Sequence, residues 1–106
     1  MRRMIQREEL VPDRSRRALP KPAREPLYRI YIHNDNVTPM DFVVDVLLAI
    51  FEVPSPNAEH IMYTAHLTGS AYVQTLPAAQ ARLRVSRARF AASLKSYPLQ
   101  FSMEPE

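Results

Sequence analysis

The sequence of 106 residues contains no cysteine, no tryptophan and a single glycine. Without cysteine there is neither a disulfide framework nor a thiolate to act as a metal ligand or nucleophile, which suits a reducing compartment. No stretch is long and apolar enough to predict a membrane span. The N-terminal MRRMIQREEL also lacks the apolar run of a secretory signal. We therefore expect a soluble, cytoplasmic protein.

Charge and proline are distributed unevenly, and 46% hydrophobic content supports one small domain. Residues 1–26 hold eight Lys/Arg against four Asp/Glu, together with four of the ten prolines. This composition predicts a flexible, basic N-terminal extension over residues 1–26, followed by a folded core domain over residues 27–106. The core segment holds six bases and seven acids.

Hydrophobic periodicity predicts the elements of the core. LYRIYIH (27–33) alternates as a half-buried strand does, with Tyr28, Ile30 and Ile32 on the buried face. SAYVQTL (70–76) and PLQFSME (98–104) are further strand candidates. Helices are predicted over about residues 39–51, from Ser55 to Gly69, and from about residue 77 to 96. The order β-α-α-β-α-β predicts an α+β sandwich of three helices on a three-stranded antiparallel sheet.

Start and stop signals mark the first two helices. Thr38 followed by Pro39 predicts an N-cap and first turn, and Ser55-Pro56 repeats the signal. The first helix is so apolar that we expect it to be largely buried. Gly69, the one glycine, predicts a left-handed residue that ends the second helix.

The third helix carries two apolar stripes on opposite faces. Ala81, Val85, Ala88 and Ala92 form the small stripe, and Leu83, Phe90 and Leu94 form the large one. If the small stripe is core, the large one is an exposed apolar patch framed by arginines and is a candidate partner surface. The bases of this segment fit a solvated helix face, the commoner case, or a nucleic-acid contact: Arg82, Arg84, Arg87, Arg89 and Lys95.

Polar side chains gather between the first strand and the first helix, in IHNDNVTPMDFV (32–43). Met62 and His66 are four residues apart and share a helix face with Ala65. If that face packs toward the first helix, an apolar hollow forms with acceptors at its mouth. Such a hollow suits a ligand that is apolar at one end and a hydrogen-bond donor at the other.

The segment YRIYIHNDNVTPMDFVVDVLLAIF (28–51) closely resembles the ClpS family of protease adaptors, whose signature is a hydrophobic strand, NDD, a variable residue and TPM-[DE]-FVV. HIMYTAHLTGSA is similar to the family's second helix, and YPLQFSMEPE to its closing strand. The resemblance extends from about Leu27 to Glu104. It implies an adaptor that binds the free N-terminal residue (Leu, Phe, Tyr or Trp) of N-degron substrates and delivers them to the ClpA unfoldase of the ClpAP protease.

The resemblance also implies roles for individual residues. Those around the substrate α-amino group would be Asn34, Asp35, Asn36 and His66. Those around its side chain would be Ile32, Thr38, Met40, Val43, Met62, Ala65 and Leu99, with Met40 as a gate against β-branched first residues. Independently, amide, carboxylate and neutral imidazole groups are suitable acceptors for the three donors of an ammonium group.

Three departures from the family pattern stand out. Asn36 replaces the second Asp of NDD, which predicts weaker amino-group binding unless Asp35 compensates. Ala65 replaces a more usual Val and predicts a larger pocket. The third helix, where ClpA docks in the family, has Ala79 and Arg82 at positions that are commonly acidic, so the predicted docking residues are Ala79, Arg82 and Arg84.

Each of these features taken alone is more often structural than functional: Asn/Asp turns, core methionines and helix-end histidines are common. The three histidines have no metal-ligand spacing, and no Ser-His-Asp arrangement is suggested. We therefore expect a monomeric binding protein without enzymatic activity, cofactor, metal or membrane contact. A second function is open, namely an interaction module that uses the basic third helix of this chain to bind another protein or RNA, without N-degron recognition. The fold expected here also resembles the C-terminal domain of the ribosomal stalk protein.

Overall fold

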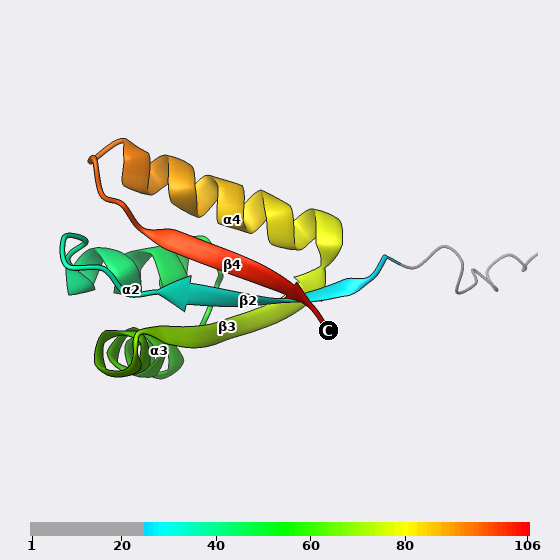
Figure 1. Cartoon of the computed structure of the whole chain (residues 1–106), viewed down its shortest axis with the longest axis horizontal. Coiled ribbons are helices and arrows are strands. Elements are labelled where there is room, and N and C mark those ends of the chain that lie inside the picture. Colours follow the sequence, from blue (N-terminus) through cyan, green and yellow to red (C-terminus); the bar gives the residue numbers. More distant parts are fainter. Residues whose placement is uncertain (1–24) are drawn as a thin grey trace, which may run out of the picture.

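The computed structural model describes residues 25–106, whose six regular elements follow the predicted order (Figure 1). They are β2 (Leu27–His33), α2 (Met40–Ala49), α3 (Ser55–Thr68), β3 (Ser70–Pro77), α4 (Ala78–Ser93) and β4 (Gln100–Pro105). The predicted N-terminal extension lies, up to residue 24, outside the described residues. All six predicted elements of the core are confirmed, with ends that differ by at most three residues.

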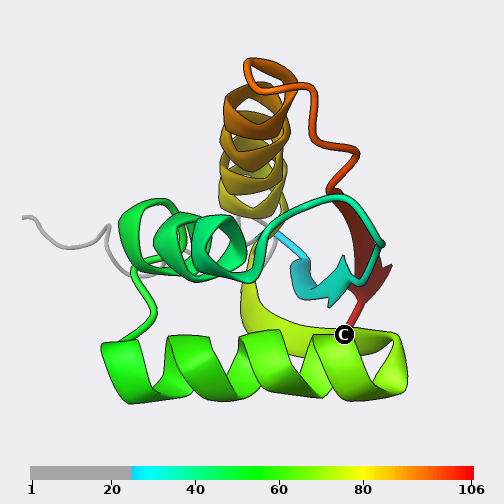
Figure 2. The same cartoon turned by 90° about the vertical axis from the view of Figure 1, so that its left-hand side faces the viewer.

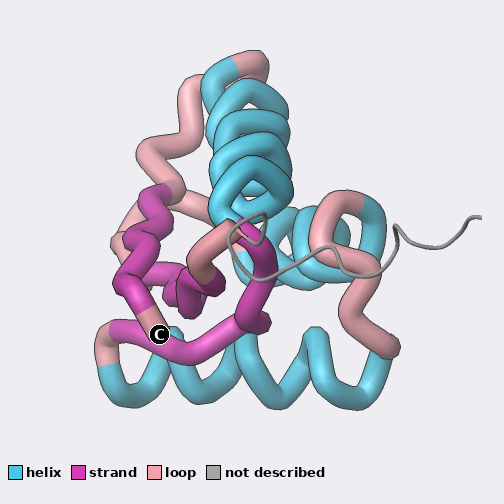
Figure 3. Tube along the Cα trace, turned by 90° about the vertical axis from the view of Figure 1, so that its right-hand side faces the viewer, coloured by secondary structure: helices cyan, strands magenta, loops and turns pink. Residues whose placement is uncertain are grey.

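The strands of the described region form one antiparallel sheet in the order β3-β2-β4, so β2 is the central strand. Ile30 of β2 lies opposite Gln74 of β3 and Met103 of β4. The pairing with β3 shifts between Ile30 and Tyr31, as at a β-bulge. The helices gather on one side of the sheet, with α2 between α3 and α4 (Figures 2 and 3). The predicted α+β sandwich is therefore confirmed.

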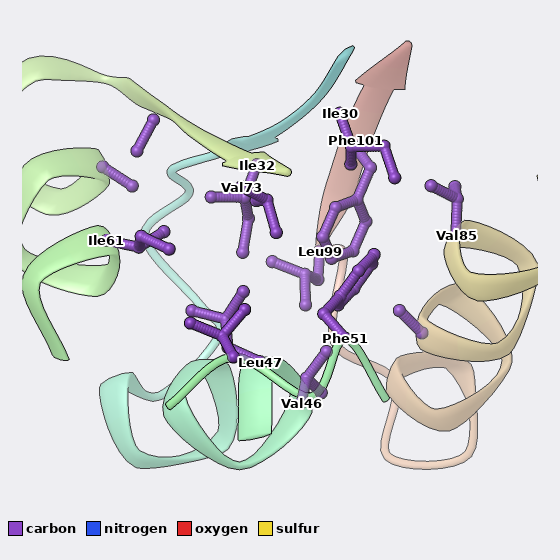
Figure 4. Close-up of a cluster of buried hydrophobic side chains, with 14 of the residues drawn as sticks. Ile30, Ile32, Val46, Leu47, Phe51, Ile61, Val73, Val85, Leu99 and Phe101 are labelled. Carbon is purple, nitrogen blue, oxygen red and sulfur yellow. The ribbon is translucent and has the colours of Figure 1, made fainter. Parts of the chain in front are cut away.

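The hydrophobic core lies between the sheet and the three helices (Figure 4). Ile30 and Ile32 of β2 are buried, as the alternation of this strand predicts. Phe51, which follows α2, is fully buried and packs on Phe101 of β4 with ring centroids 5.3 Å apart. Truncating a buried Phe to Ala costs about 3–5 kcal/mol, so this pair holds α2 firmly against the sheet.

The starts of α2 and α3 differ from the prediction. Pro39 is the N-cap of α2 rather than its first helical residue, and Pro54 rather than Ser55 caps α3. Neither helix has a side-chain cap hydrogen bond. Both prolines have extended backbone angles, because the residue before the first turn needs a β-type conformation that proline adopts without strain. The hydroxyl of Thr38 donates instead to Asp35 Oδ2, at 2.8 Å.

Helix α2 is less buried than its composition predicts. Of its residues only Val46 and Leu47 are buried, while Met40 and Leu48 are 40% and 37% exposed. The helix has one face on the core, and the residues around its N-terminus border an open hollow. The expectation of a largely buried helix is therefore wrong, because apolar content alone does not say whether a face meets protein or an open site.

The C-terminal end of α3 and the orientation of α4 follow the prediction. Gly69 has φ +102°, a left-handed conformation that side chains rarely adopt, and its N–H donates to the Ala65 carbonyl at 2.8 Å. In α4 the small stripe of alanines and Val85 is buried. The large stripe is exposed, with Leu83 49%, Phe90 64% and Leu94 71% accessible.

Candidate functional site

A pocket of about 350 Å³ opens where β2 ends, bordered by the start of α2, the second half of α3 and the residue before β4. All eleven residues predicted for the amino-group and side-chain sites line it: Ile32, Asn34, Asp35, Asn36, Thr38, Met40, Val43, Met62, Ala65, His66 and Leu99. Its size lies in the lower part of the range of about 300–1,000 Å³ that is typical of small-ligand sites.

The inner wall of the pocket is apolar and built from core residues. Ile32, Ala65 and Leu99 are buried side chains of three different elements or their flanks. Two methionines differ in exposure: Met62 is 7% exposed, whereas Met40 is 40% exposed. Because a methionine side chain is unbranched and flexible, Met40 has the freedom to adapt to different occupants, while Met62 is held by its neighbours.

The loop between β2 and α2 is organised by the carboxylate of Asp35. Its Oδ1 accepts the N–H groups of Val37 and Thr38 at 2.8 and 2.6 Å, and its Oδ2 accepts the Thr38 hydroxyl. Partial burial acts to raise the pKa of this carboxyl, but the three hydrogen bonds outweigh burial and hold the pKa below its ordinary value. Asp35 therefore stays ionised and fixes the loop.

A backbone hydrogen bond joins this loop to the end of α3. The N–H of Asn34 donates to the carbonyl of Gly69 at 2.9 Å, and Gly69 in turn is bonded to Ala65. The left-handed turn at Gly69 thus brings the last turn of α3, with His66, to the same pocket as the loop. This is the contribution of the single glycine to the site.

The polar rim holds three side chains with unused hydrogen-bonding capacity. Asn34, Asn36 and His66 are exposed and make no side-chain hydrogen bond to any residue between 25 and 106. Amide oxygens and a neutral imidazole nitrogen accept hydrogen bonds, and the Asp35 carboxylate adds a negative charge. The rim is therefore suited to a cationic donor, and the wall behind it to an apolar group.

Three further residues that were not predicted from the sequence also line the pocket: His33, Val37 and Pro39. His33 Nε2 lies 2.7 Å from Ser102 Oγ of β4, so its ring is tied to the sheet. Because Ile30 and Ile32 are on the buried face, alternation along β2 places His33 on the opposite face, and no pocket role was predicted for it. Its place as the last strand residue before the polar loop was the signal that could have found it.

A second hollow of about 330 Å³ adjoins the pocket and shares Met40 and Met62 with it. Carboxylates of both helices border this hollow, namely Asp41 and Asp45 of α2 and Glu59 of α3. The surroundings of the pocket are therefore acidic, although the chain as a whole has a net charge of +3.

The residues predicted for unfoldase docking lie on α4, away from the pocket. Ala79 and Arg82 are exposed. Arg84 is half-buried: its guanidinium donates to the carbonyl of Phe51 at 3.0 Å and to Gln74 Oε1 at 3.3 Å. Its other terminal nitrogen lies 3.9 Å from a carboxylate oxygen of Glu52. Arg84 is thus engaged within the fold, where it ties α4 to the end of α2.

The described residues contain no group of three or more His, Asp or Glu side chains that could hold a metal ion. Among the helices between residues 25 and 106, none has both the length and the apolar character needed to cross a membrane.

Comparison with known proteins identifies the family. The profile of the family described as "ATP-dependent Clp protease adaptor protein ClpS" matches residues 23–102. The chain belongs to the ClpS family. The ClpS 2 adapter protein of Mesorhizobium japonicum is 39% identical over 87 residues, which are 82% of this chain and 86% of the relative. The ClpS 1 adapter protein of Rhodopseudomonas palustris is 36% identical over 98 residues, 92% of this chain and 95% of the relative.

A solved ClpS structure shares the fold. Agrobacterium tumefaciens ClpS2, solved bound to L-phenylalaninamide, is 35% identical and superposes with a TM-score of 0.74, covering 78% of this chain and all (100%) of that one. The predicted family and its fold are therefore confirmed, and the chain is related to proteins named as adaptors of the ATP-dependent Clp protease.

Proposed function

We propose that this ClpS protein binds the free N-terminal residue of N-degron substrates, with Leu, Phe, Tyr or Trp in first position, and delivers them to the ClpA unfoldase of the ClpAP protease. The observation that carries the proposal is the single pocket lined by all eleven predicted residues, with a polar rim in front of an apolar wall. The rim would match the amino group of an unblocked apolar N-terminal residue, and the wall would match its side chain.

The α-amino group would be bound at the rim. Asn34, Asn36 and His66 would accept its three hydrogen bonds, since their side chains are not otherwise engaged within residues 25–106. Asp35 would act differently, because its oxygens already accept three hydrogen bonds of the loop. We assign to it the positioning of Asn34 and Asn36 and a favourable negative charge.

The first side chain would enter the apolar half. Ile32, Met62, Ala65 and Leu99 would form its floor, with Val43 and the Thr38 methyl beside them and Met40 at the mouth. The small Ala65 leaves space that suits aromatic rings. A β-branched first residue would meet Met40 close to its Cβ, where its second branch has no room.

The relative solved with L-phenylalaninamide supports this assignment. That ligand has a free amino group and a phenyl side chain, the two features that the polar rim and the apolar wall would receive in this proposal. Delivery to ClpA is the second half of the proposal, with Ala79 and Arg82 as exposed docking candidates and residues 1–26 as an extension that engages the unfoldase. The division into this extension and a monomeric core domain over residues 27–106, and the cytoplasmic location, stay predictions.

A panel of labelled peptides tests the proposal by fluorescence anisotropy. Peptides that begin with Phe and Leu should bind, and the peptide that begins with Ile should bind much more weakly. Acetylation of the Phe peptide removes the ammonium group and leaves polar groups unmatched, which costs about 1–3 kcal/mol of binding free energy, or about five- to 150-fold in affinity. Equal affinity for the free and acetylated Phe peptides would contradict N-terminal recognition.

Delivery needs its own measurement. A pull-down with the N-domain of ClpA should retain the full-length protein, and the charge-reversing variant Arg82→Glu should change the amount retained. The Phe peptide should bind this variant as it binds the wild type, because Arg82 is outside the pocket. If the N-domain retained neither the wild type nor the variant, the proposed delivery to ClpA would be wrong, whatever the peptide measurements show.

A further inference from the structure

The outer face of α4 carries three large apolar side chains that the pocket does not use. Leu83, Phe90 and Leu94 follow one another at spacings of seven and four residues, which places them on one stripe of the helix. The exposed fractions of the three side chains are 49%, 64% and 71%, respectively. Figure 1 shows α4 along the edge of the molecule, with one side against the sheet and the other open.

Basic side chains surround this stripe. Arg82, Arg87 and Lys95 are exposed and form no ion pair with any residue between 25 and 106. The other two bases of the segment are engaged, since Arg84 bonds to Phe51 and Arg89 donates to the carbonyl of Phe101 at 3.2 Å. Helix α4 contains no acidic residue. The outer face therefore has an apolar centre and a positive border.

The charge of this face argues against the chain's own N-terminal segment as its occupant. Residues 1–24 hold eight Lys/Arg against three Asp/Glu, a net charge of +5, which a positive border repels. The centre of the face argues against nucleic acid. Leu83 and Leu94 have no ring on which a base could stack, and phosphates gain nothing from aliphatic contacts.

We propose that the outer face of α4 binds an acidic amphipathic helix of a partner protein. Apolar residues of that helix would pack against Leu83, Phe90 and Leu94, whose spacing is that of helix-on-helix packing. Its flanking Asp and Glu residues would pair with Arg82, Arg87 and Lys95. This surface is independent of the pocket, because none of these six residues lines it.

Two designed peptides test the proposal against the full-length, ¹⁵N-labelled protein. Both carry Leu and Phe along one helical stripe, and one has Glu at the flanking positions where the other has Lys. In amide chemical-shift titrations the Glu peptide should bind saturably, with shifts confined to α4 and its flanks, and more weakly at high salt. The Lys peptide should cause no saturable shifts.

Two variants provide a second test of the proposed surface. Phe90→Ser should weaken the Glu peptide about tenfold or more, because aromatic anchors at the centre of an interface carry much of its energy. Leu67→Ser is the matched control, since Leu67 is 77% exposed on α3 and lies outside both hollows. It should leave Glu-peptide binding unchanged, and both variants should keep the wild-type Tm.

Four outcomes would overturn the proposal. They are equal binding of the Glu and Lys peptides, no binding of either peptide, displacement of the Glu peptide by single-stranded RNA, and a dimer in light scattering that Phe90→Ser dissociates. The last outcome would assign the face to a second copy of this chain. Each would do so whatever the result of the Phe-peptide measurements, so the proposed N-terminal recognition by the pocket stands or falls separately.

Discussion

The pocket and the outer face of α4 both bring apolar and charged side chains to the surface, but they do so in different ways. In the pocket, loop and helix ends surround a hollow, and a network of hydrogen bonds around Asp35 and Gly69 fixes the rim. On α4 the side chains project from one regular helix with no such network. The contrast teaches that the pocket is prepared for a small ligand end, whereas the helix face offers area to a larger partner.

The largest effect that separates the two regions is expected for His66→Ala. Loss of one acceptor from a site that must match an ammonium group should weaken binding of the Phe peptide by about 1–3 kcal/mol, or about five- to 150-fold. His60→Ala is the matched control, since His60 is exposed on the same helix but lines neither hollow. Anisotropy would show an error in the rim assignment if both variants kept wild-type affinity.

A change in the apolar half should alter selectivity instead. Ala65→Val adds two methyl groups to a buried position of the pocket wall. Overpacking of a buried position typically costs about 1–3 kcal/mol of stability, so the added groups would compete with a bound side chain for space. A peptide that begins with Trp should lose more affinity than one that begins with Leu, because the larger ring needs the space. Isothermal titration with both peptides measures the ratio, and an unchanged ratio would place the ring elsewhere.

Asp35 should connect the rim to protein stability. Its pKa is lower in the folded protein than its ordinary value of 3.8, so its ionised form stabilises the fold. This contribution is fully present above the unfolded pKa and is lost as pH falls through the lower folded pKa. In urea unfolding, Asp35→Asn should be less stable than wild type by about 1 kcal/mol at neutral pH, since hydrogen bonds of a charged group are at stake. The difference should shrink in strongly acidic solution, and a pH-independent difference would contradict this origin.

The smallest effect is expected at Asn36, where the family pattern has a second Asp. Asn36→Asp adds a negative charge to an exposed position of the rim, and exposed ion pairs contribute about 0.2–1 kcal/mol. Affinity for the Phe peptide should rise by a few-fold at most, and the gain should decrease with salt. Asn57→Asp makes the same charge change on α3 outside both hollows and should have no effect. Equal gains in the two variants would indicate a general charge effect.

Local patterns were sufficient for much of the fold. Alternation in residues 27–33 predicted the buried Ile30 and Ile32, and the single glycine predicted the left-handed end of α3. The cap predictions at Thr38 and Ser55 were wrong because the residue type alone does not fix which backbone position enters the first turn. The docking role predicted for Arg84 stays a prediction, but its hydrogen bond to the carbonyl of Phe51, 33 residues away in the chain, is a contact that no local pattern could predict.

The pocket residues were found together because the resemblance to ClpS proteins linked segments that no local pattern connects. Leu99 illustrates this, since nothing in its neighbourhood suggests that it lies beside Ile32 at the floor of a pocket. His33 was missed for a different reason: strand alternation places its side chain on the outer face, where it contacts Ser102, and this pattern does not show that the residue also borders the pocket.

A titration of the ¹⁵N-labelled protein with L-phenylalaninamide is the decisive test of N-terminal recognition by the pocket. Amide shifts are expected at residues 32–40, 62–66 and 99 and none along α4, with far weaker shifts for N-acetyl-phenylalaninamide, which has the same ring and no ammonium group. Equal shifts with the two compounds, or shifts that centre on α4, would contradict the assignment of N-terminal recognition to the pocket.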